Sequence, residues 1–149
     1  MVLQDTKIFQ GTIRENIAYG KPNASIEEIK QAAELSFANT FIEKLPDGYD
    51  TYISNSDMLS EGEVQLLNIA RIMLIKPPIL ILDEATSNID LLTEDMIKKA
   101  ILELTSNSTS IIIAHRLSTI KNCDFIVFIE DGNLSLIHIS EPTRPEPIS

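Results

Sequence analysis

The sequence predicts an α/β fold in which a helical front half, up to about residue 76, precedes a β-α-β-α-β back half with a mainly parallel sheet. In the front half, apolar residues recur at helical spacing. In the back half, short runs dominated by apolar residues, at 79–82, 110–114 and 125–129, alternate with helical stretches. Such runs are typical of strands buried in a parallel sheet.

Capping signals mark the expected helices of the front half. Thr12, followed by Glu15, and Ser25, followed by Glu28, each pair a hydroxyl with a carboxylate three residues later. Ser60 repeats this spacing and opens the longest helix, which Pro77-Pro78 stops. Residues 49–58 are expected to be irregular. The expected helices are residues 12–18, one that follows Ser25, residues 40–45 and residues 60–75.

In the back half, Asp90 is expected to cap a helix that runs to Leu104. Residues 117–121 are expected to form a shorter helix. Residues 130–133, Glu-Asp-Gly-Asn, predict a turn after the third strand. The final segment does not fit the domain, because three of the seven prolines fall within the last eight residues. We expect residues 135–149 to be non-native or disordered; they resemble translated sequencing-adapter read-through.

Composition excludes several classes of protein. The chain has 149 residues, of which 44% are hydrophobic and 23% charged, an ordinary globular balance. The net charge of −10 argues against binding to nucleic acid or to an anionic membrane. A single cysteine, Cys123, excludes a disulfide framework. No apolar run approaches the roughly 20 residues of a membrane helix, so any attachment to a membrane is expected through a partner or another segment.

Two adjacent carboxylates, Asp83 and Glu84, directly follow the apolar run at residues 79–82. Ligands of open α/β sheets bind where parallel strands end. There one carboxylate can hold Mg²⁺ while the next deprotonates an attacking water. The alternative is an acidic strand-to-loop junction without chemistry. His115 follows the next apolar run in the same way and could donate to a phosphate, although a single histidine after a strand is more often structural.

The start of the longest helix is a second candidate site. Ser60 and Glu63 form its capping box, and Gly62 allows close approach to the backbone. The N–H groups at a helix start bind anions. Taken alone, this pattern favours a simple cap over a phosphate site.

In combination, these segments resemble the ATPase domain of ATP-binding cassette (ABC) transporters, a P-loop NTPase-type fold, and in particular the exporter type. The resemblance covers residues 1–134, and five segments follow the family's order. They are the Q-loop region at residues 2–17, the signature motif at 59–71, Walker B at 79–84, the D-loop at 87–90 and the switch-histidine segment at 114–118.

The resemblance implies a role for each matching residue, with ATP and Mg²⁺ as cofactors. Gln4 and Asp83 serve Mg²⁺, and Gln4 also reaches the γ-phosphate. Glu84 is the general base for hydrolysis, and His115 contacts the γ-phosphate. The nucleotide held by the opposite subunit is contacted by Ser60 and Gly62, with Glu63 beside them. Asp90 lies at the dimer interface.

The family's architecture also implies partners and a location. The partners are a second ABC ATPase domain, identical or different, and the transmembrane domain of a transporter; nucleic acid is not among them. We expect the chain at the cytoplasmic face of the cell membrane. The matching subdivision is residues 1–11 for the Q-loop region, 12–76 for a helical subdomain, 77–134 for the distal core and 135–149 for the tail.

The sequence departs from the family pattern in four places, one of which is the tail after about Leu134, where the family would continue with a strand and a closing helix. It contains no G-x-x-x-x-G-K-[ST] phosphate loop (Walker A) and no preceding aromatic residue to stack on adenine. We therefore expect a fragment with an internal Met1 that does not bind or hydrolyse ATP appreciably alone. Glu63 stands where the signature usually has Gln, which adds a negative charge. Residues 54–57 replace a usual Gly-Glu pair, which places coupling to the transmembrane domain in doubt.

Two alternatives to an exporter ATPase remain open. DNA-repair and chromosome-structure ATPases share the Walker B and signature motifs, but they insert long coiled coils between the Q-loop and the signature, where this chain has a compact helical stretch. The second alternative is a non-catalytic assembly module that lends its signature half-site to a partner with a Walker A loop.

Overall fold

The computed structural model describes residues 7–83, 89–106, 108–113, 123 and 125–138. The chain divides into two compact units, Met1–Ile113 and Ala114–Ser149. The predicted helix at residues 117–121 lies outside the described residues, as do Gln4, Glu84 and His115.

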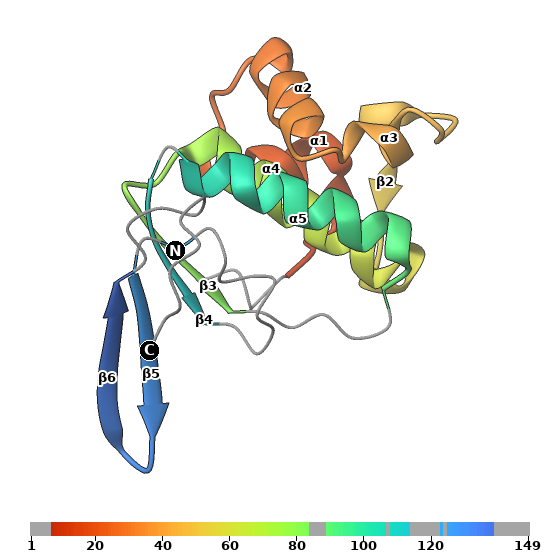
Figure 1. The fold of residues 1–149 in the computed structure, drawn as a ribbon. Coiled ribbons are helices and arrows are strands. Elements are labelled where there is room, and N and C mark those ends of the chain that lie inside the picture. Colours follow the sequence, from red (N-terminus) through yellow and green to blue (C-terminus); the bar gives the residue numbers. More distant parts are fainter. Residues whose placement is uncertain (1–6, 84–88, 107, 114–122, 124, 139–149) are drawn as a thin grey trace. The chain divides into compact units, whose positions relative to one another are not determined.

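Short elements make up the first part of the first unit (Figure 1). Two predicted caps are confirmed, because the Glu15 N–H donates to Thr12 Oγ1 at 3.1 Å and the Glu28 N–H donates to Ser25 Oγ at 3.2 Å. The elements are β1 (Gly11–Thr12), α1 (Ile13–Ile17), η1 (Ala18–Gly20), α2 (Ile26–Leu35), α3 (Asn39–Ile42), η2 (Gly48–Asp50), β2 (Tyr52–Ile53) and η3 (Ser56–Met58).

The pairing of β1 with β2 differs from the irregular structure expected at residues 49–58. Gly11 pairs with Ile53 and Thr12 with Tyr52 in an antiparallel ladder. The Ile13 N–H continues this contact by donating to the Thr51 carbonyl oxygen at 3.0 Å. A strand of two residues is too short to show alternation in a sequence, so only the contact in the fold reveals it.

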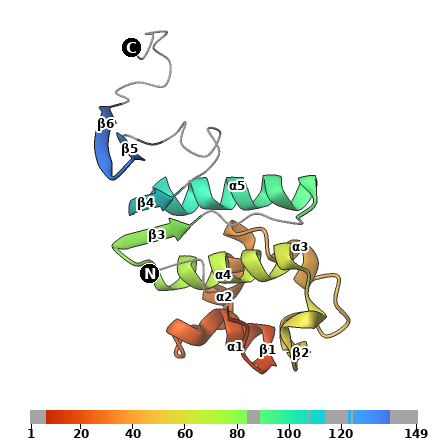
Figure 2. The same cartoon turned by 90° about the horizontal axis from the view of Figure 1, so that it is seen from below.

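Helix α4 (Glu61–Ile75) forms the centre of this unit. Figure 2 shows it between α5 (Leu91–Ser106) and the group that contains α1 and β1. The sequence predicts one apolar stripe, but burial extends nearly around the helix because α1, α2 and α5 all pack against it. The buried residues of α4 are Gly62, Leu66, Leu67, Asn68, Ile69, Ala70, Arg71, Ile72, Met73 and Leu74.

Strands β3 (Ile79–Asp83) and β4 (Thr109–Ile113) pair in parallel, as the sequence predicts, with Asp83 opposite Ile113. Leu80 and Leu82 are buried among the helices. The next strand departs from the prediction of one mainly parallel sheet. It forms β5 (Phe125–Glu130), which pairs antiparallel with β6 (Asn133–His138) in the second unit.

The turn between β5 and β6 explains this hairpin. Asp131 and Gly132 both have positive φ, 50° and 79°, as a two-residue hairpin turn requires. Such a turn returns the chain directly alongside the strand it has just left. Strand β6 includes residues 135–138, the beginning of the segment for which the sequence predicts a non-native or disordered tail. Residues 139–149 lie outside the described part.

Candidate nucleotide site

The N-terminus of α4 carries the predicted capping box. The Glu63 N–H donates to Ser60 Oγ at 3.1 Å, and the Ser60 N–H donates to Glu63 Oε1 at 2.9 Å. Helix geometry leaves the N–H groups of Glu61 and Gly62 without an intrahelical acceptor. The Ser60 hydroxyl accepts one bond through its oxygen and keeps its hydrogen to donate. This end of α4 therefore offers three donors that suit a phosphate.

The start of α5 packs directly against the start of α4. A Cβ atom added to Gly62 would lie 2.5 Å from Thr93 Cγ2 and 3.4 Å from Ile89 Cγ2, so only glycine fits there. Asp90 caps α5 by accepting the Thr93 N–H on Oδ2 at 3.0 Å. Hydrogen bonds from Thr93 also lower the pKa of Asp90 below its ordinary value. The fold thus brings Gly62 and the turn capped by Asp90 together.

Asp83 ends β3, where it is half-buried. Glu84, the next residue, and His115, two residues beyond the paired Ile113, lie outside the described part of the chain. Among the described residues, no group of three His, Cys, Asp or Glu side chains could hold a metal ion. One carboxylate suits Mg²⁺ nevertheless, because this ion is commonly bound through one or two carboxylates, nucleotide phosphates and water.

The carboxylate of Glu63 affects the phosphate site in two ways. By accepting the Ser60 N–H, it occupies a donor that a phosphate could otherwise use. It also places a negative charge beside the remaining donors, which weakens the attraction for an anion. The three remaining donors therefore fit a phosphate oxygen, but the negative charge of Glu63 beside them weakens its binding.

Thr93 and Arg71 are residues of this region that the sequence analysis missed. Thr93 shows a weak signal, since it follows Asp90 at capping distance in the chain. Arg71 is a charged residue within an otherwise apolar part of α4, and buried arginines need partners. That pattern could have marked Arg71 for attention, although it does not reveal which groups Arg71 contacts.

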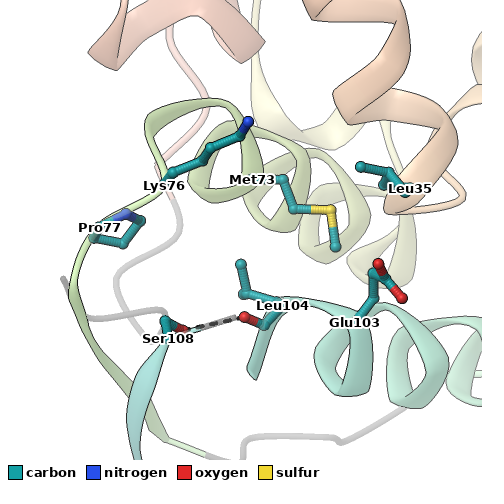
Figure 3. Close-up of a pocket in the computed structure, with 7 residues that line it drawn as sticks. All are labelled: Leu35, Met73, Lys76, Pro77, Glu103, Leu104 and Ser108. Atoms are coloured by element: carbon teal, nitrogen blue, oxygen red, sulfur yellow. Dashed lines mark hydrogen bonds between the residues drawn. The ribbon is translucent and has the colours of Figure 1, made fainter. Parts of the chain in front are cut away.

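A cavity of about 240 Å³ lies elsewhere, between the ends of α2, α4 and α5 (Figure 3). Met73 and Leu104 line it, and the Ser108 hydroxyl donates to the Leu104 carbonyl oxygen at 3.1 Å. Its charged lining residues are one base, Lys76, and one acid, Glu103. It contains none of the predicted site residues, so it is separate from the candidate phosphate site.

Comparison with known proteins identifies the family. Residues 1–87, more than half of the chain, match the family model described as "ABC transporter". The chain belongs to the ABC transporter family. The ABC transporter ATP-binding protein YfiC of Bacillus subtilis (strain 168) is 52% identical over 134 residues, which are 89% of this chain and 22% of YfiC. The fatty acid ABC transporter ATP-binding/permease protein of Mycobacterium bovis is 50% identical over 135 residues, 90% of this chain and 21% of that protein.

A solved structure supports the same assignment. The structure of a bacterial Atm1-family ABC exporter with ATP bound matches 90% of this chain and 24% of its own, at 43% identity and a TM-score of 0.77. The chain thus has part of the ABC ATPase fold of exporters, and it spans about a fifth to a quarter of the length of these proteins. No helix in the described part of the chain is long and apolar enough to cross a membrane.

Proposed function

We propose that this chain acts as the Walker B and signature part of an ABC exporter's ATPase domain, which hydrolyses ATP to power transport. The observation that carries the proposal is the start of α4, where the Ser60 hydroxyl and two backbone N–H groups form a phosphate-binding end beside the cap of α5. The ABC transporter relatives at about half identity and the Atm1-family exporter structure support it.

The proposed chemistry divides between two sets of residues, of which the first acts on the nucleotide bound by this domain. When bound, ATP supplies the γ-phosphoryl group and Mg²⁺ neutralises its charge. Asp83 and Gln4 provide oxygen ligands for the metal, and Glu84 takes the proton of the attacking water. His115 donates a hydrogen bond to the γ-phosphate.

The remaining residues serve a second ATPase domain. Ser60 and Gly62 contact the nucleotide of the opposite domain, and Asp90 lies at the interface between the two. Closure of this dimer on ATP and its reopening after hydrolysis drive alternating access in a transmembrane domain. The Mycobacterium bovis relative is named an ATP-binding/permease protein, which supports a transmembrane partner. With such a partner, the chain lies at the cytoplasmic face of the cell membrane.

Complementation tests the proposal. We expect the chain alone to show no ATPase activity, and micromolar binding of fluorescent ATP by the chain alone would contradict this. Mixed with the Walker A-containing N-terminal part of the YfiC ATPase domain, the chain should restore hydrolysis, and Ser60→Arg should abolish it. Ser25→Arg is the matched control, because Ser25 caps α2 with the same hydrogen bond but lies outside the proposed site.

A second function rests on the same observation, because the capping box and free donors at the start of α4 form a phosphate-binding end by themselves. The chain could lend its signature half-site to a partner that hydrolyses ATP with its own Walker B residues. Glu84→Gln separates the two functions. It should abolish the activity restored with the N-terminal part of the YfiC ATPase domain if this chain supplies the base. A chain that only lends its signature should instead support hydrolysis by a partner domain with its own Walker A and Walker B residues, and Glu84→Gln should leave that activity intact.

A further inference from the structure

Arg71 lies in the middle of α4 with its guanidinium buried and bonded to the segment that follows Gln4. Its Nε donates to the Asn16 carbonyl oxygen at 2.9 Å, and both Nη atoms donate to the Lys7 carbonyl oxygen at 3.3 Å. Nη1 also donates to Asn68 Oδ1 at 2.9 Å. One side chain therefore joins α4 to two points of the backbone between residues 7 and 16.

Asn16 fixes the same backbone from the other side. Its Oδ1 accepts the Phe9 N–H at 2.8 Å, and its Nδ2 donates to the carbonyl oxygens of Phe9 at 2.9 Å and Thr12 at 3.0 Å. Asn16 is itself buried. All three of its hydrogen bonds lie within the segment that Arg71 contacts, so the two side chains form one network.

An aromatic pair covers the guanidinium. The rings of Phe9 and Tyr19 stack with centroids 4.1 Å apart and 12° between their planes. The Arg71 guanidinium carbon lies 5.4 Å from the Phe9 centroid and 5.6 Å from that of Tyr19, within the range of cation–π attraction. Phe9 and Tyr19 are 36% and 58% exposed, so the pair forms part of the surface while Arg71 supports it from inside.

From this geometry we infer that Arg71 is a positioning residue that holds the backbone after Gln4 and the Phe9–Tyr19 pair in fixed register against α4. Ser60 lies eleven residues earlier, about 16 Å away along the axis of the same helix. A displacement of the aromatic pair is thereby transmitted to the phosphate-facing end of α4. Lysine cannot replace arginine here, because the contacts use a planar fork of several donors and a flat face for stacking.

Hydrogen exchange of the full chain tests the positioning. In Arg71→Lys we expect the amides of residues 7–20 to exchange roughly tenfold faster while those of α5 keep their wild-type rates, since local opening is confined to one unit of structure. Arg14→Lys is the matched control, because Arg14 is half-exposed and its ion pair among the described residues is with Asp50 at 3.1 Å. Uniform acceleration in both regions, or no acceleration, would overturn the inference.

The second measurement concerns nucleotide binding and rests on the proposed function. Residues 1–134 replace the matching segment of full-length YfiC, and ATPase kinetics are measured per folded molecule. We expect Arg71→Lys to raise the KM for ATP about fivefold, a loss of about 1 kcal/mol, and Arg14→Lys to leave it unchanged. An unchanged KM in Arg71→Lys, whether or not kcat falls, would overturn the inference. An inactive unsubstituted chimera would count against the proposed function, and the exchange data would then decide the role of Arg71.

Discussion

The carboxylate of Glu63 has two opposite effects. It stabilises the start of α4, and it repels a phosphate bound there. Its carboxylate completes the capping box by accepting the Ser60 N–H, yet its charge lies beside the donors of the candidate site. Glutamine at this position keeps the box and removes the charge. The sequence predicts the cap, because a capping box depends only on residues three apart. It also predicts the added charge, because Glu63 stands where the signature usually has Gln.

We therefore predict that Glu63→Gln lowers the KM for ATP in the YfiC chimera by about fivefold, corresponding to about 1 kcal/mol of relieved repulsion at a solvent-exposed site. The free energy of unfolding should change by less than about 0.5 kcal/mol, since the cap survives. Glu28→Gln, at the same position in α2, is the control and should leave the KM unchanged. A raised KM would show that the carboxylate assists binding.

Asp90 gives the chain a dependence on pH. Hydrogen bonds from Thr93 lower its pKa in the folded state, so its stabilising effect is present above the ordinary pKa and is lost as pH falls through the folded value. Asn at this position caps the helix without a charge. We predict that the stability advantage of the wild type over Asp90→Asn, measured by urea unfolding, shrinks steadily between about pH 5 and pH 2. A difference that stays constant over this range would contradict the prediction.

The contact between α4 and α5 is set by the absence of a side chain at Gly62. Adding a methyl group there meets Thr93 Cγ2 at 2.5 Å, which forces the helix starts apart. We predict that Gly62→Ala lowers the free energy of unfolding by about 1–3 kcal/mol. Thr93→Ser removes the obstructing methyl and keeps the N–H that Asp90 accepts, so the double variant should regain most of that loss. Purely additive effects in this double-mutant cycle would show that the close approach is not the cause.

The elements differ in how far the sequence determines them. The caps at Thr12, Ser25 and Ser60 were predictable because each is formed by neighbours in the chain. The parallel pairing of β3 with β4 followed from two apolar runs around a helix. The antiparallel partner of β5 is not predicted, because the sequence analysis assigns residues 135–149, which include most of β6, to the tail.

In the candidate site, too, the sequence predicts local features but not contacts between distant residues. The cap at Ser60 and Asp83 at the end of β3 were visible in local sequence. The contact between Gly62 and Thr93 joins residues 31 positions apart. The network around Arg71 reaches residues 55 or more positions away. No local periodicity encodes such contacts, because they depend on how α1, α4 and α5 pack together.

In the described part of the first unit, helices lie on one face of the β3–β4 sheet, and apolar residues on the other face are exposed. Leu80 and Leu82 point to the covered side and are buried, whereas Ile79, Ile111 and Ile113 on the alternate positions are 55%, 54% and 48% exposed. Among the described residues this sheet has two strands, and each of them has an edge that no described strand pairs with. Exposed apolar faces of this kind bind hydrophobic dyes and promote self-association.

We accordingly predict that the chain alone binds the dye ANS and self-associates in sedimentation experiments. Replacing Ile111 and Ile113 by Thr keeps the β-branched shape that strands prefer and should reduce the dye fluorescence by roughly half. Leu102→Gln, which removes a similarly exposed apolar residue from α5, is the control and should have little effect because it lies on a helix outside this face. The apolar sheet face binds the dye only if the strand substitutions lower the fluorescence and the helix substitution does not. Equal effects of both would assign the dye binding to exposed apolar surface in general.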